Sequence, residues 1–305
     1  MNNILKIAMN IGIFLVVAGF LAYMATSINR NISQGISSIG FFNEEFEGQY
    51  TYDTLFRIGD NINHFDLNGE RLFIAAEQSL YIYDTDGNRQ HSFFVGQGVR
   101  DVTVSKDEIY LLYPTRIAVY SMKGQLIREW NACSELSDYC SFTVAGNAVF
   151  VTDVENKDIC KYTTEGVLVK FIKSPTGFII PSYSFDIDCW NDTIYCVNSG
   201  RHCIETYTQN GDFITSLGSA GAEAGYFTGC CNPVHISFTS DGTLITSEKG
   251  NPRISNFERN GHFNEVWLNN KHLGNGTNAC EAKALDDKLY VAIKKTITVF
   301  KINNI

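Results

Sequence analysis

The chain is 305 residues long, with 44% hydrophobic and 13% aromatic residues and a formal net charge of −9. Such a length and apolar content bury a large core, in one large domain or two ordinary ones. An acidic surface repels phosphate backbones, so we expect no nucleic-acid partner. With 25 Gly and only 5 Pro, the composition is neither disordered nor collagen-like, and it favours a β-rich globular body.

Residues 7–28 form the first predicted element, an uncharged and mostly apolar stretch. At about 1.5 Å per residue, a helix over this stretch is roughly 33 Å long, enough to cross the hydrocarbon core of a bilayer. We therefore predict a transmembrane signal anchor over residues 1–28. The alternative is a signal peptide cleaved near Ala25, but the stretch is long for such a peptide and its cleavage sequence matches poorly.

Residues 29–49 are polar and rich in Gly and Ser, which predicts a flexible tether. Lys6 and Arg30 lie on opposite sides of the apolar stretch and balance each other, so charge does not orient the helix. A cysteine-rich body after a membrane span favours export of that body. We expect a single-pass cell-membrane protein whose body lies on the extracytoplasmic, periplasmic side.

A repeat runs through residues 50–305 and decides the predicted fold. Five glycines follow an aromatic residue by four positions, each in a polar turn between strand-like runs: Tyr83/Gly87, Tyr120/Gly124, Tyr162/Gly166, Tyr207/Gly211 and Phe257/Gly261. This is the pattern of a hairpin turn that needs a positive φ. Two further β runs precede each aromatic residue, so each repeat has four strands, as a propeller blade has.

The end of the repeat array gives the number of blades. Phe300 is the sixth aromatic residue of the series, and too little chain follows it for a fourth strand. The unpaired β run at residues 51–58 has the right pattern to supply that strand and to remove the exposed edges of an open array. We therefore predict an all-β fold: a six-bladed β-propeller over residues 50–305, closed by an N-terminal strand and preceded by one transmembrane α-helix.

Residues 198–265 resemble two consecutive NHL repeats. The family's arginine-isoleucine-aromatic strand and its Gly-rich connection ending in Phe and Pro are matched by Arg253, Ile254, Phe257, Gly218, Gly221, Gly225, Phe227 and Pro233. The resemblance is loose over the first three blades, and blade four departs from it by placing Cys203 between Arg201 and Ile204. It implies a six-bladed propeller but no activity, because NHL propellers serve as binding platforms, as sensor domains and, in some lineages, as metal-dependent lyases.

Two adjacent cysteines, Cys230 and Cys231, form a Gly-Cys-Cys-Asn-Pro variant of this pattern at the entry to blade five. Such a pair closes a strained disulfide, ligates a metal or an iron–sulfur cluster, or simply provides two small residues in a buried loop. Its position in the longest connection, next to an inner strand, favours a functional role.

Counting back about seven residues from the first hairpin turn of each blade marks the starts of the inner strands. These positions are Asn63 or His64, Arg100, Cys140, Ser184, His235 and Cys280. In a propeller these starts gather at the mouth of the central channel, so Cys140, His235 and Cys280 would point to one axis, with Cys230 and Cys231 just above. Thiolates and imidazole suit a transition metal or an iron–sulfur cluster. We predict a metal site from these five residues, with Cys230, Cys231 and Cys280 as the cofactor ligands. An alignment error of one residue would turn the side chains away.

Two alternatives compete with this site. Cysteines can form structural disulfides, for example between Cys133 and Cys140, which flank one loop, although an odd number of cysteines leaves at least one unpaired in the chain. An oxygen-rich metal site is the second alternative, with the candidates His64, His235, Asp186, Asp188 and Glu281. These residues form no convincing ligand set in the sequence, where each is better explained as a satisfied polar residue at a strand end.

Two functional hypotheses follow. The first is a non-enzymatic accessory or scaffold subunit that docks on protein subunits of a membrane complex, with its cysteine site serving electron transfer. The second is a metal-dependent lyase or hydrolase with its site in the channel. The sequence has no G-x-S-x-G, H-E-x-x-H or P-loop motif and no recognisable catalytic base, so we favour the first hypothesis.

Overall fold

The computed structural model describes residues 50–274 and 278–302. These residues belong to one compact unit, Gly48–Ile305. The predicted anchor and tether, residues 1–28 and 29–49, lie outside the described part. Within that part, the helices are all too short or too polar to cross a bilayer.

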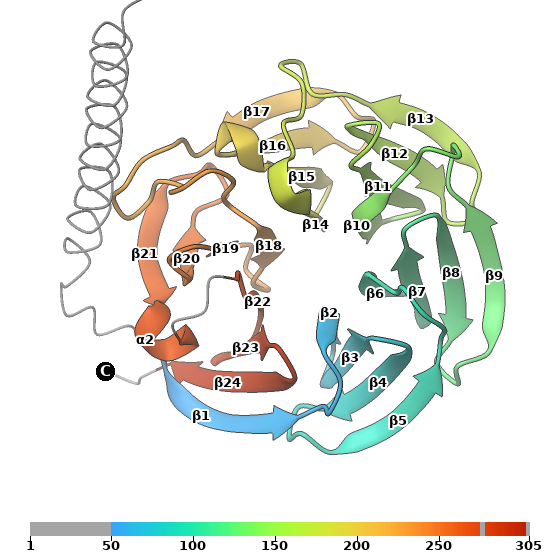
Figure 1. Cartoon of the computed structure of the whole chain (residues 1–305), viewed down its shortest axis with the longest axis horizontal. Helices are drawn as coiled ribbons and strands as arrows, with labels where there is room; N and C mark the ends of the chain where they lie inside the picture. The colour runs from blue at the N-terminus through green and yellow to red at the C-terminus, as the bar shows by residue number, and fades with distance from the viewer. Residues whose placement is uncertain (1–49, 275–277, 303–305) are drawn as a thin grey trace, which may run out of the picture. The chain divides into compact units, whose positions relative to one another are not determined.

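The described residues form six four-stranded antiparallel sheets arranged around a central channel (Figure 1). In blades one to three the strands, from the channel outward, are β2 (Ile62–Asn68), β3 (Arg71–Ala76), β4 (Ser79–Asp84) and β5 (Arg89–Phe94); β6 (Asp101–Ser105), β7 (Glu108–Tyr113), β8 (Arg116–Ser121) and β9 (Leu126–Asn131); β10 (Tyr139–Ala145), β11 (Ala148–Asp153), β12 (Asp158–Thr163) and β13 (Leu168–Ile172). In blades four to six they are β14 (Ile187–Trp190), β15 (Thr193–Asn198), β16 (Cys203–Thr208) and β17 (Phe213–Leu217); β18 (His235–Phe238), β19 (Leu244–Glu248), β20 (Arg253–Phe257) and β21 (Phe263–Leu268); β22 (Glu281–Leu285), β23 (Lys288–Ile293), β24 (Thr296–Ile302) and β1 (Tyr50–Arg57). The predicted six-bladed β-propeller is confirmed.

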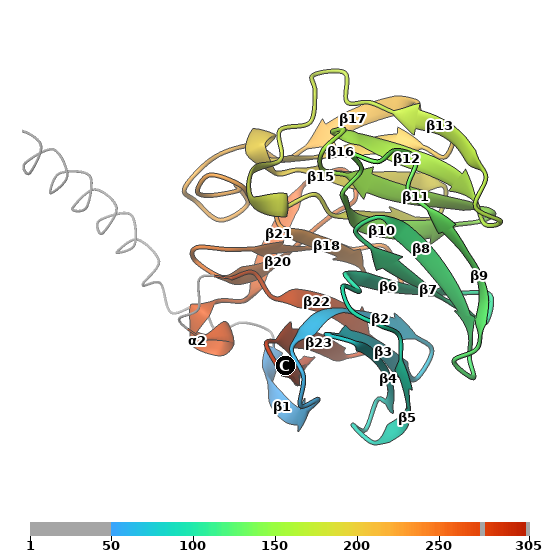
Figure 2. The same ribbon diagram turned by 45° about the vertical axis from the view of Figure 1, so that its right-hand side comes forward.

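Short helical turns lie only in the connections of the described chain. They are η1 (Pro181–Tyr183), η2 (Ser199–Arg201) and α2 (Asn270–Leu273). Figure 2, turned from the first view, shows the loops that carry η1 and η2 projecting beyond the ends of the strands.

The N-terminal strand closes the ring as the repeat count predicts. Strand β1 pairs antiparallel with β24, from Tyr50 opposite Ile302 to Arg57 opposite Thr296. The first and last described strands thus share one sheet, and blade six gains its outer strand from the other end of the chain. This pairing covers the edge of β24 that would otherwise be open to another chain.

The turn glycines are confirmed, and the structure adds a second reason for them. All five have positive φ, for example +75° at Gly124 and +85° at Gly166. Each turn also packs against the outer strand of the preceding blade. A Cβ at Gly124 would lie 2.1 Å from the ring of Phe93, and one at Gly166 would lie 2.7 Å from the ring of Trp130. A larger residue is therefore excluded by packing as well as by backbone conformation.

The core lies between neighbouring blades. One hydrophobic cluster combines Phe73 and Ile82 of blade one with Val102 and Leu111 of blade two. The other clusters join the other neighbouring blades in the same way, including blade six with blade one. Both faces of a middle strand are therefore buried. This explains why β3 and β11 have continuous runs of buried residues rather than an alternating pattern.

The arginines of the two NHL-like repeats make equivalent contacts. Arg253 pairs with Glu248, with Nε 2.5 Å from Oε1, and donates to the carbonyl of Tyr226. Arg201 donates from Nε to the carbonyl of Gly177 at 2.9 Å. In both blades the arginine ties the connection from the previous blade to the start of the third strand.

Candidate functional site

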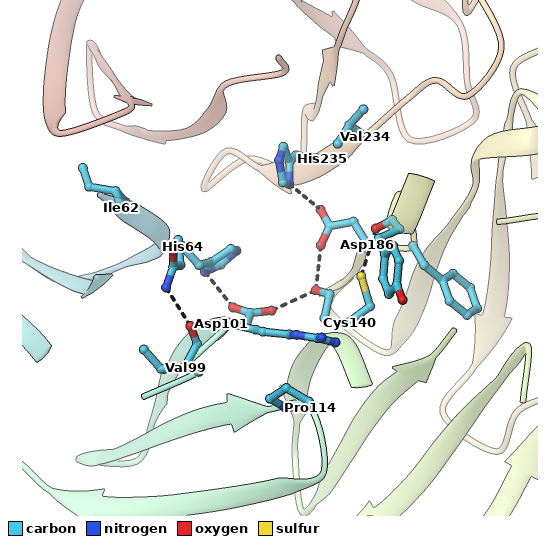
Figure 3. Close-up of a pocket in the computed structure, with 15 residues that line it drawn as sticks. Ile62, His64, Val99, Asp101, Pro114, Cys140, Asp186, Val234 and His235 are labelled. Atoms are coloured by element: carbon cyan, nitrogen blue, oxygen red, sulfur yellow. Dashed lines mark hydrogen bonds and ion pairs between the residues drawn. The ribbon is translucent and has the colours of Figure 1, made fainter. Parts of the chain in front are cut away.

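The starts of the inner strands β2, β6, β10, β14 and β18 surround one mouth of the central channel, where a cavity of about 560 Å³ opens. Its lining is part apolar and part polar and includes Ile62, Val99, Arg100, Cys140, Phe185 and His235. Figure 3 shows these groups around a chain of hydrogen bonds and ion pairs. The mouth is where the sequence predicted a site.

His64 joins three blades at this mouth. Its Nδ1 lies 2.6 Å from Asp101 Oδ1, and its Nε2 lies 2.6 Å from Glu281 Oε1. Burial alone would lower the pKa of His64, but the two carboxylates outweigh burial and hold this pKa well above its usual value. The raised pKa favours the imidazolium form, in which both ring nitrogens carry a proton and neither offers a lone pair to a metal ion.

Ser141 extends this network to blade four. Its Oγ lies 2.9 Å from Asp101 Oδ2 and 2.7 Å from Asp186 Oδ1. Burial raises the pKa of Asp186. Burial also acts to raise the pKa of Asp101, but the charge and hydrogen bond of His64 bring it below its usual value. Of these two carboxyl groups, Asp186 is thus the one that gains a proton at the higher pH.

The same carboxylates accept backbone N–H groups from the inner strand of the next blade. The pairs are Glu281 with the amide of Phe65 at 3.0 Å, Asp101 with Phe142 at 3.1 Å, Asp186 with Ile236 at 2.7 Å, and Asp66 with Val104 at 2.8 Å. An inner strand is the channel-side edge of its sheet and would otherwise leave these amides unpaired. Both oxygens of Asp186 and Glu281 and Oδ2 of Asp101 have a protein partner in the described chain, whereas Asp101 Oδ1 is in ion-pair contact with His64 Nδ1 but makes no aligned hydrogen bond. The network therefore has a structural role, because it pairs the edge amides of the inner strands.

A second polar layer lies deeper in the channel, on inner strands β2, β14 and β22. It consists of Asp66, Asp188 and Lys283, which follow His64, Asp186 and Glu281 by two residues. Lys283 Nζ is 3.8 Å from both Asp66 Oδ1 and Glu281 Oε1. Burial would lower the pKa of Lys283, but the surrounding carboxylates raise it above its usual value. Burial raises the pKa of Asp188 to about 6. This layer holds more carboxyl groups than cations, which keeps Asp188 easy to protonate.

Two partly exposed side chains that line the cavity, His235 and Arg100, have polar atoms that a ligand could reach. His235 is 29% exposed, and its Nδ1 lies 3.8 Å from Asp186 Oδ2, beyond a direct hydrogen bond. Arg100 is 32% exposed. Its Nη1 lies 2.5 Å from Asp138 Oδ1 and donates to the carbonyl of Tyr139, and its other nitrogens remain for a ligand. Figure 3 shows His235 and Asp186 facing each other at the mouth.

The predicted metal ligands are partly brought together. Cys140 and His235 line the same cavity. The Cys140 thiol donates to the carbonyl of Tyr183 at 3.0 Å, and burial raises its pKa to about 12. Cys280, in contrast, packs in the hydrophobic cluster of blades five and six with Leu268 and does not line the cavity.

The inner-strand alignment is offset from the channel network in four blades. The network uses Asp101, Ser141 and Glu281, each directly after the marked position, and Asp186, two residues after Ser184. Because successive side chains of a strand point to opposite faces, Cys280 packs into the hydrophobic cluster of blades five and six. Arg100 and Cys140 line the cavity beside the network. His64 and His235 are the correctly aligned positions. The oxygen-rich set judged unconvincing in the sequence, with His64, Asp186 and Glu281, is the one that converges.

Cys230 and Cys231 lie in the connection between β17 and β18, with their sulfurs 2.9 Å apart. Cys230 is exposed and Cys231 is buried. Asn232 anchors the loop, because its side chain donates to the carbonyls of Thr228 and Lys249 and accepts from the Lys249 amide at 2.9 Å. The side chain of Asn232 therefore holds the conformation of this loop through hydrogen bonds. Metal ligation by the cysteine pair stays a prediction.

A different thiol group was missed by the sequence analysis. Cys133 Sγ lies 3.5 Å from Cys160 Sγ, and one ligand atom from each of these cysteines and from Asp153 falls within 4.8 Å of the others. Among the described residues this is the one such group that could hold a metal ion. Cys133 thus neighbours Cys160 and not Cys140, the disulfide partner considered from the sequence. The two cysteines are 27 positions apart, and they meet because the connection between β9 and β10 packs against strand β12.

No family model matches the chain, and no curated protein matches its sequence. Solved structures resemble its fold. Virginiamycin B lyase from Staphylococcus aureus is 14% identical with a TM-score of 0.60, covering 83% of this chain and 99% of that one. A catalytically inactive form of the same enzyme with quinupristin is 16% identical with a TM-score of 0.58, covering 84% and 99%. A protein of unknown function from Bacteroides caccae is 11% identical with a TM-score of 0.53, covering 80% and 83%. At these identities the likeness shows the fold alone.

Proposed function

We propose that this chain is a membrane-tethered accessory subunit whose propeller binds a small amphipathic molecule in the channel-mouth cavity. The observation that carries the proposal is that a buried ion-pair network and an open cavity lie side by side at the channel mouth. His64, Asp101 and Glu281 are held together by close ion pairs within the protein, and His64 and Asp101 form one side of a cavity of about 560 Å³. A volume of this size suits a small-molecule ligand.

The wall of the cavity indicates the chemistry of the ligand. Ile62, Val99 and Phe185 offer an apolar surface, and Arg100 and His235 offer hydrogen-bond donors. An apolar body with one acidic or acceptor group at its end fits this lining. The remaining parts of the proposal concern location: attachment through residues 7–28, an extracytoplasmic propeller, and docking on protein subunits of a membrane complex through the acidic surface.

An iron–sulfur cluster at Cys230 and Cys231 is not part of the proposal. Such clusters take four protein ligands. Around this pair the described residues provide only the two sulfurs, since the one three-ligand group found lies at Cys133, Asp153 and Cys160.

The test is a fluorescence titration of the full-length protein in detergent with anilinonaphthalene sulfonate, a probe with an apolar body and one anionic group. Val234→Trp fills the cavity without touching the network, and we expect it to weaken binding at least about tenfold. Val167→Trp is the matched control, since Val167 is 62% exposed in blade three. Equal affinity of both variants and the wild type would overturn the cavity as the binding site.

A metal-dependent lyase or hydrolase is the second candidate. Two observations favour it: the His235–Asp186 pair faces the cavity, and three of the solved structures of similar fold are named as virginiamycin B or streptogramin B lyases. A buried carboxyl beside an imidazole is an arrangement for general-base catalysis. The metal has a poor ligand set here, because both nitrogens of His64 are already bound by carboxylates.

Chromatography of quinupristin incubated with the protein, with and without added magnesium chloride, tests this candidate. Conversion that His235→Ala abolishes and His262→Ala preserves would establish a lyase or hydrolase and reject the accessory role. Binding of quinupristin without conversion would support the accessory role. His262 suits the control because it is exposed at a turn of blade five.

A further inference from the structure

A buried thiol pocket in blade three lies apart from the channel mouth. Cys133 belongs to the connection between β9 and β10, Cys160 is in the middle of β12, and Asp153 ends β11. The two sulfurs are 3.5 Å apart. Two sulfurs bound at about 2.3 Å to one tetrahedral ion lie about 3.8 Å apart. The observed spacing is thus close to that of two ligands on a common metal ion.

The carboxylate of this pocket is held in place by its own hydrogen bonds. Asp153 Oδ1 accepts from the amides of Asp138 at 3.1 Å and of Glu155 and Asn156 at 3.2 Å, and Oδ2 accepts from Asn156 Nδ2 at 2.8 Å. Outer hydrogen bonds of this kind fix the orientation of metal ligands. Ser137 Oγ lies 3.4 Å from Cys133 Sγ and offers a neutral fourth donor.

The charge around the pocket also favours a cation. Asp158 Oδ1 lies 3.8 Å from Cys160 Sγ. Asp158 is also paired directly with Asp153 across strands β11 and β12, and both aspartates are buried. Acidic groups are thus crowded in a buried space, where a bound divalent cation would compensate the charge of two thiolates.

We propose that Cys133, Asp153 and Cys160 bind a thiophilic divalent cation of the zinc type, with Ser137 or a water molecule completing four ligands. The site is closed and structural. It fixes the connection at residues 132–138, which leads into the start of β10 and thereby into Ser141 of the channel network. Cys133 also contributes its amide to Tyr139 Oη at 3.0 Å, which links the pocket directly to that strand.

Cobalt(II) titration of the full-length protein tests this site. The protein is purified in detergent, reduced, stripped with a chelator and titrated anaerobically with cobalt(II) chloride. We expect a thiolate-to-cobalt charge-transfer band and the visible bands of tetrahedral cobalt, saturating at about one equivalent per chain. The double variant Cys133→Ser/Cys160→Ser should lose the charge-transfer band, and Asp153→Asn should weaken binding at least about tenfold.

The matched control is Cys196→Ser/Cys203→Ser, which removes two buried thiols from blade four and should keep the cobalt spectrum.

Thiol labelling of the wild type adds a readout that does not depend on variant folding: zinc should slow maleimide labelling of Cys133 and Cys160, and chelator should restore it. A disulfide between Cys133 and Cys160 in the isolated protein, seen as a mass loss of two hydrogens, would overturn the proposal. Absence of the charge-transfer band in the reduced wild type would also overturn it.

Discussion

The channel mouth and the thiol pocket of blade three both concentrate acidic and polar groups, yet they differ in how those groups are satisfied. At the mouth, His64 lies between two carboxylates, and the remaining carboxylate oxygens accept backbone amides of the next blade. In the pocket, one ligand atom from each of Cys133, Cys160 and Asp153 lies within 4.8 Å of the others. The first region is held together by contacts within the protein, whereas we propose that the second region holds a cation.

This difference shows why a cluster of titratable residues is not in itself an active site. In the channel, the carboxylates serve the architecture, because a propeller exposes the edge of every inner strand to its axis. Burying a charge is costly unless it is paired, and His64 and Lys283 provide that pairing. The groups that we propose for ligand binding at the mouth are the partly exposed Arg100 and His235, which lie beside the network.

The largest expected effect comes from breaking the network at its centre. His64→Ala leaves Asp101 and Glu281 buried without their cation, and loss of one partner of a buried pair costs about 3–5 kcal/mol. Urea unfolding of the variant and of His91→Ala, an exposed histidine of β5, measures the difference. The control should change stability by about 0.5 kcal/mol or less. A similar small loss in both variants would contradict a structural network.

A pH dependence of stability tests the second channel layer. Burial raises the pKa of Asp188 to about 6 from 3.8, so the folded state binds this proton more tightly than the unfolded state. The contribution of Asp188 is therefore most favourable below about pH 4 and is lost as the pH rises to about 6, a change of about 3 kcal/mol. Comparison of unfolding curves of the wild type and Asp188→Asn across this range isolates the effect. Parallel curves would show that Asp188 titrates normally.

Removal of the proposed cation should destabilise blade three. A ligand present at about 100 times its dissociation constant stabilises the folded state by about 2.7 kcal/mol. A chelator should therefore lower the melting temperature of the zinc-loaded wild type and leave Cys133→Ser/Cys160→Ser unchanged. Calorimetry with zinc chloride and then chelator measures this shift. An equal response of both proteins would place any bound zinc elsewhere.

The smallest effect on stability is expected at the cavity wall. His235 is partly exposed and 3.8 Å from its nearest carboxylate, so His235→Ala should change the free energy of unfolding by about 0.5 kcal/mol or less. Binding of anilinonaphthalene sulfonate should nevertheless weaken. A loss of stability as large as that of His64→Ala would mean that His235 is part of the structural network and is not one of the ligand-binding side chains that line the cavity.

The fold was predictable because its signals are local and repeated. Gly124 and Gly166 mark turns whose positive φ is required by the chain itself, and the β run at residues 51–58 was recognisable as an unpaired strand. The candidate site was predicted less well. The alignment located the channel mouth and His235, but it selected Cys140 and Cys280 where Ser141 and Glu281 form the network. The predicted ligation by Cys230 and Cys231, the NHL relationship, the membrane anchor and the cellular location stay predictions.

The sequence by itself determined the number of blades, the four strands of each and the closure of the ring, because periodic turns and apolar runs act over short distances along the chain. The tertiary structure decided which polar side chains converge. Strand side chains alternate with a period of two, so a shift of one residue exchanges the channel face for a buried face. Cys133 and Cys160 meet only because a loop folds back against a strand 27 residues away, a contact that no local pattern encodes.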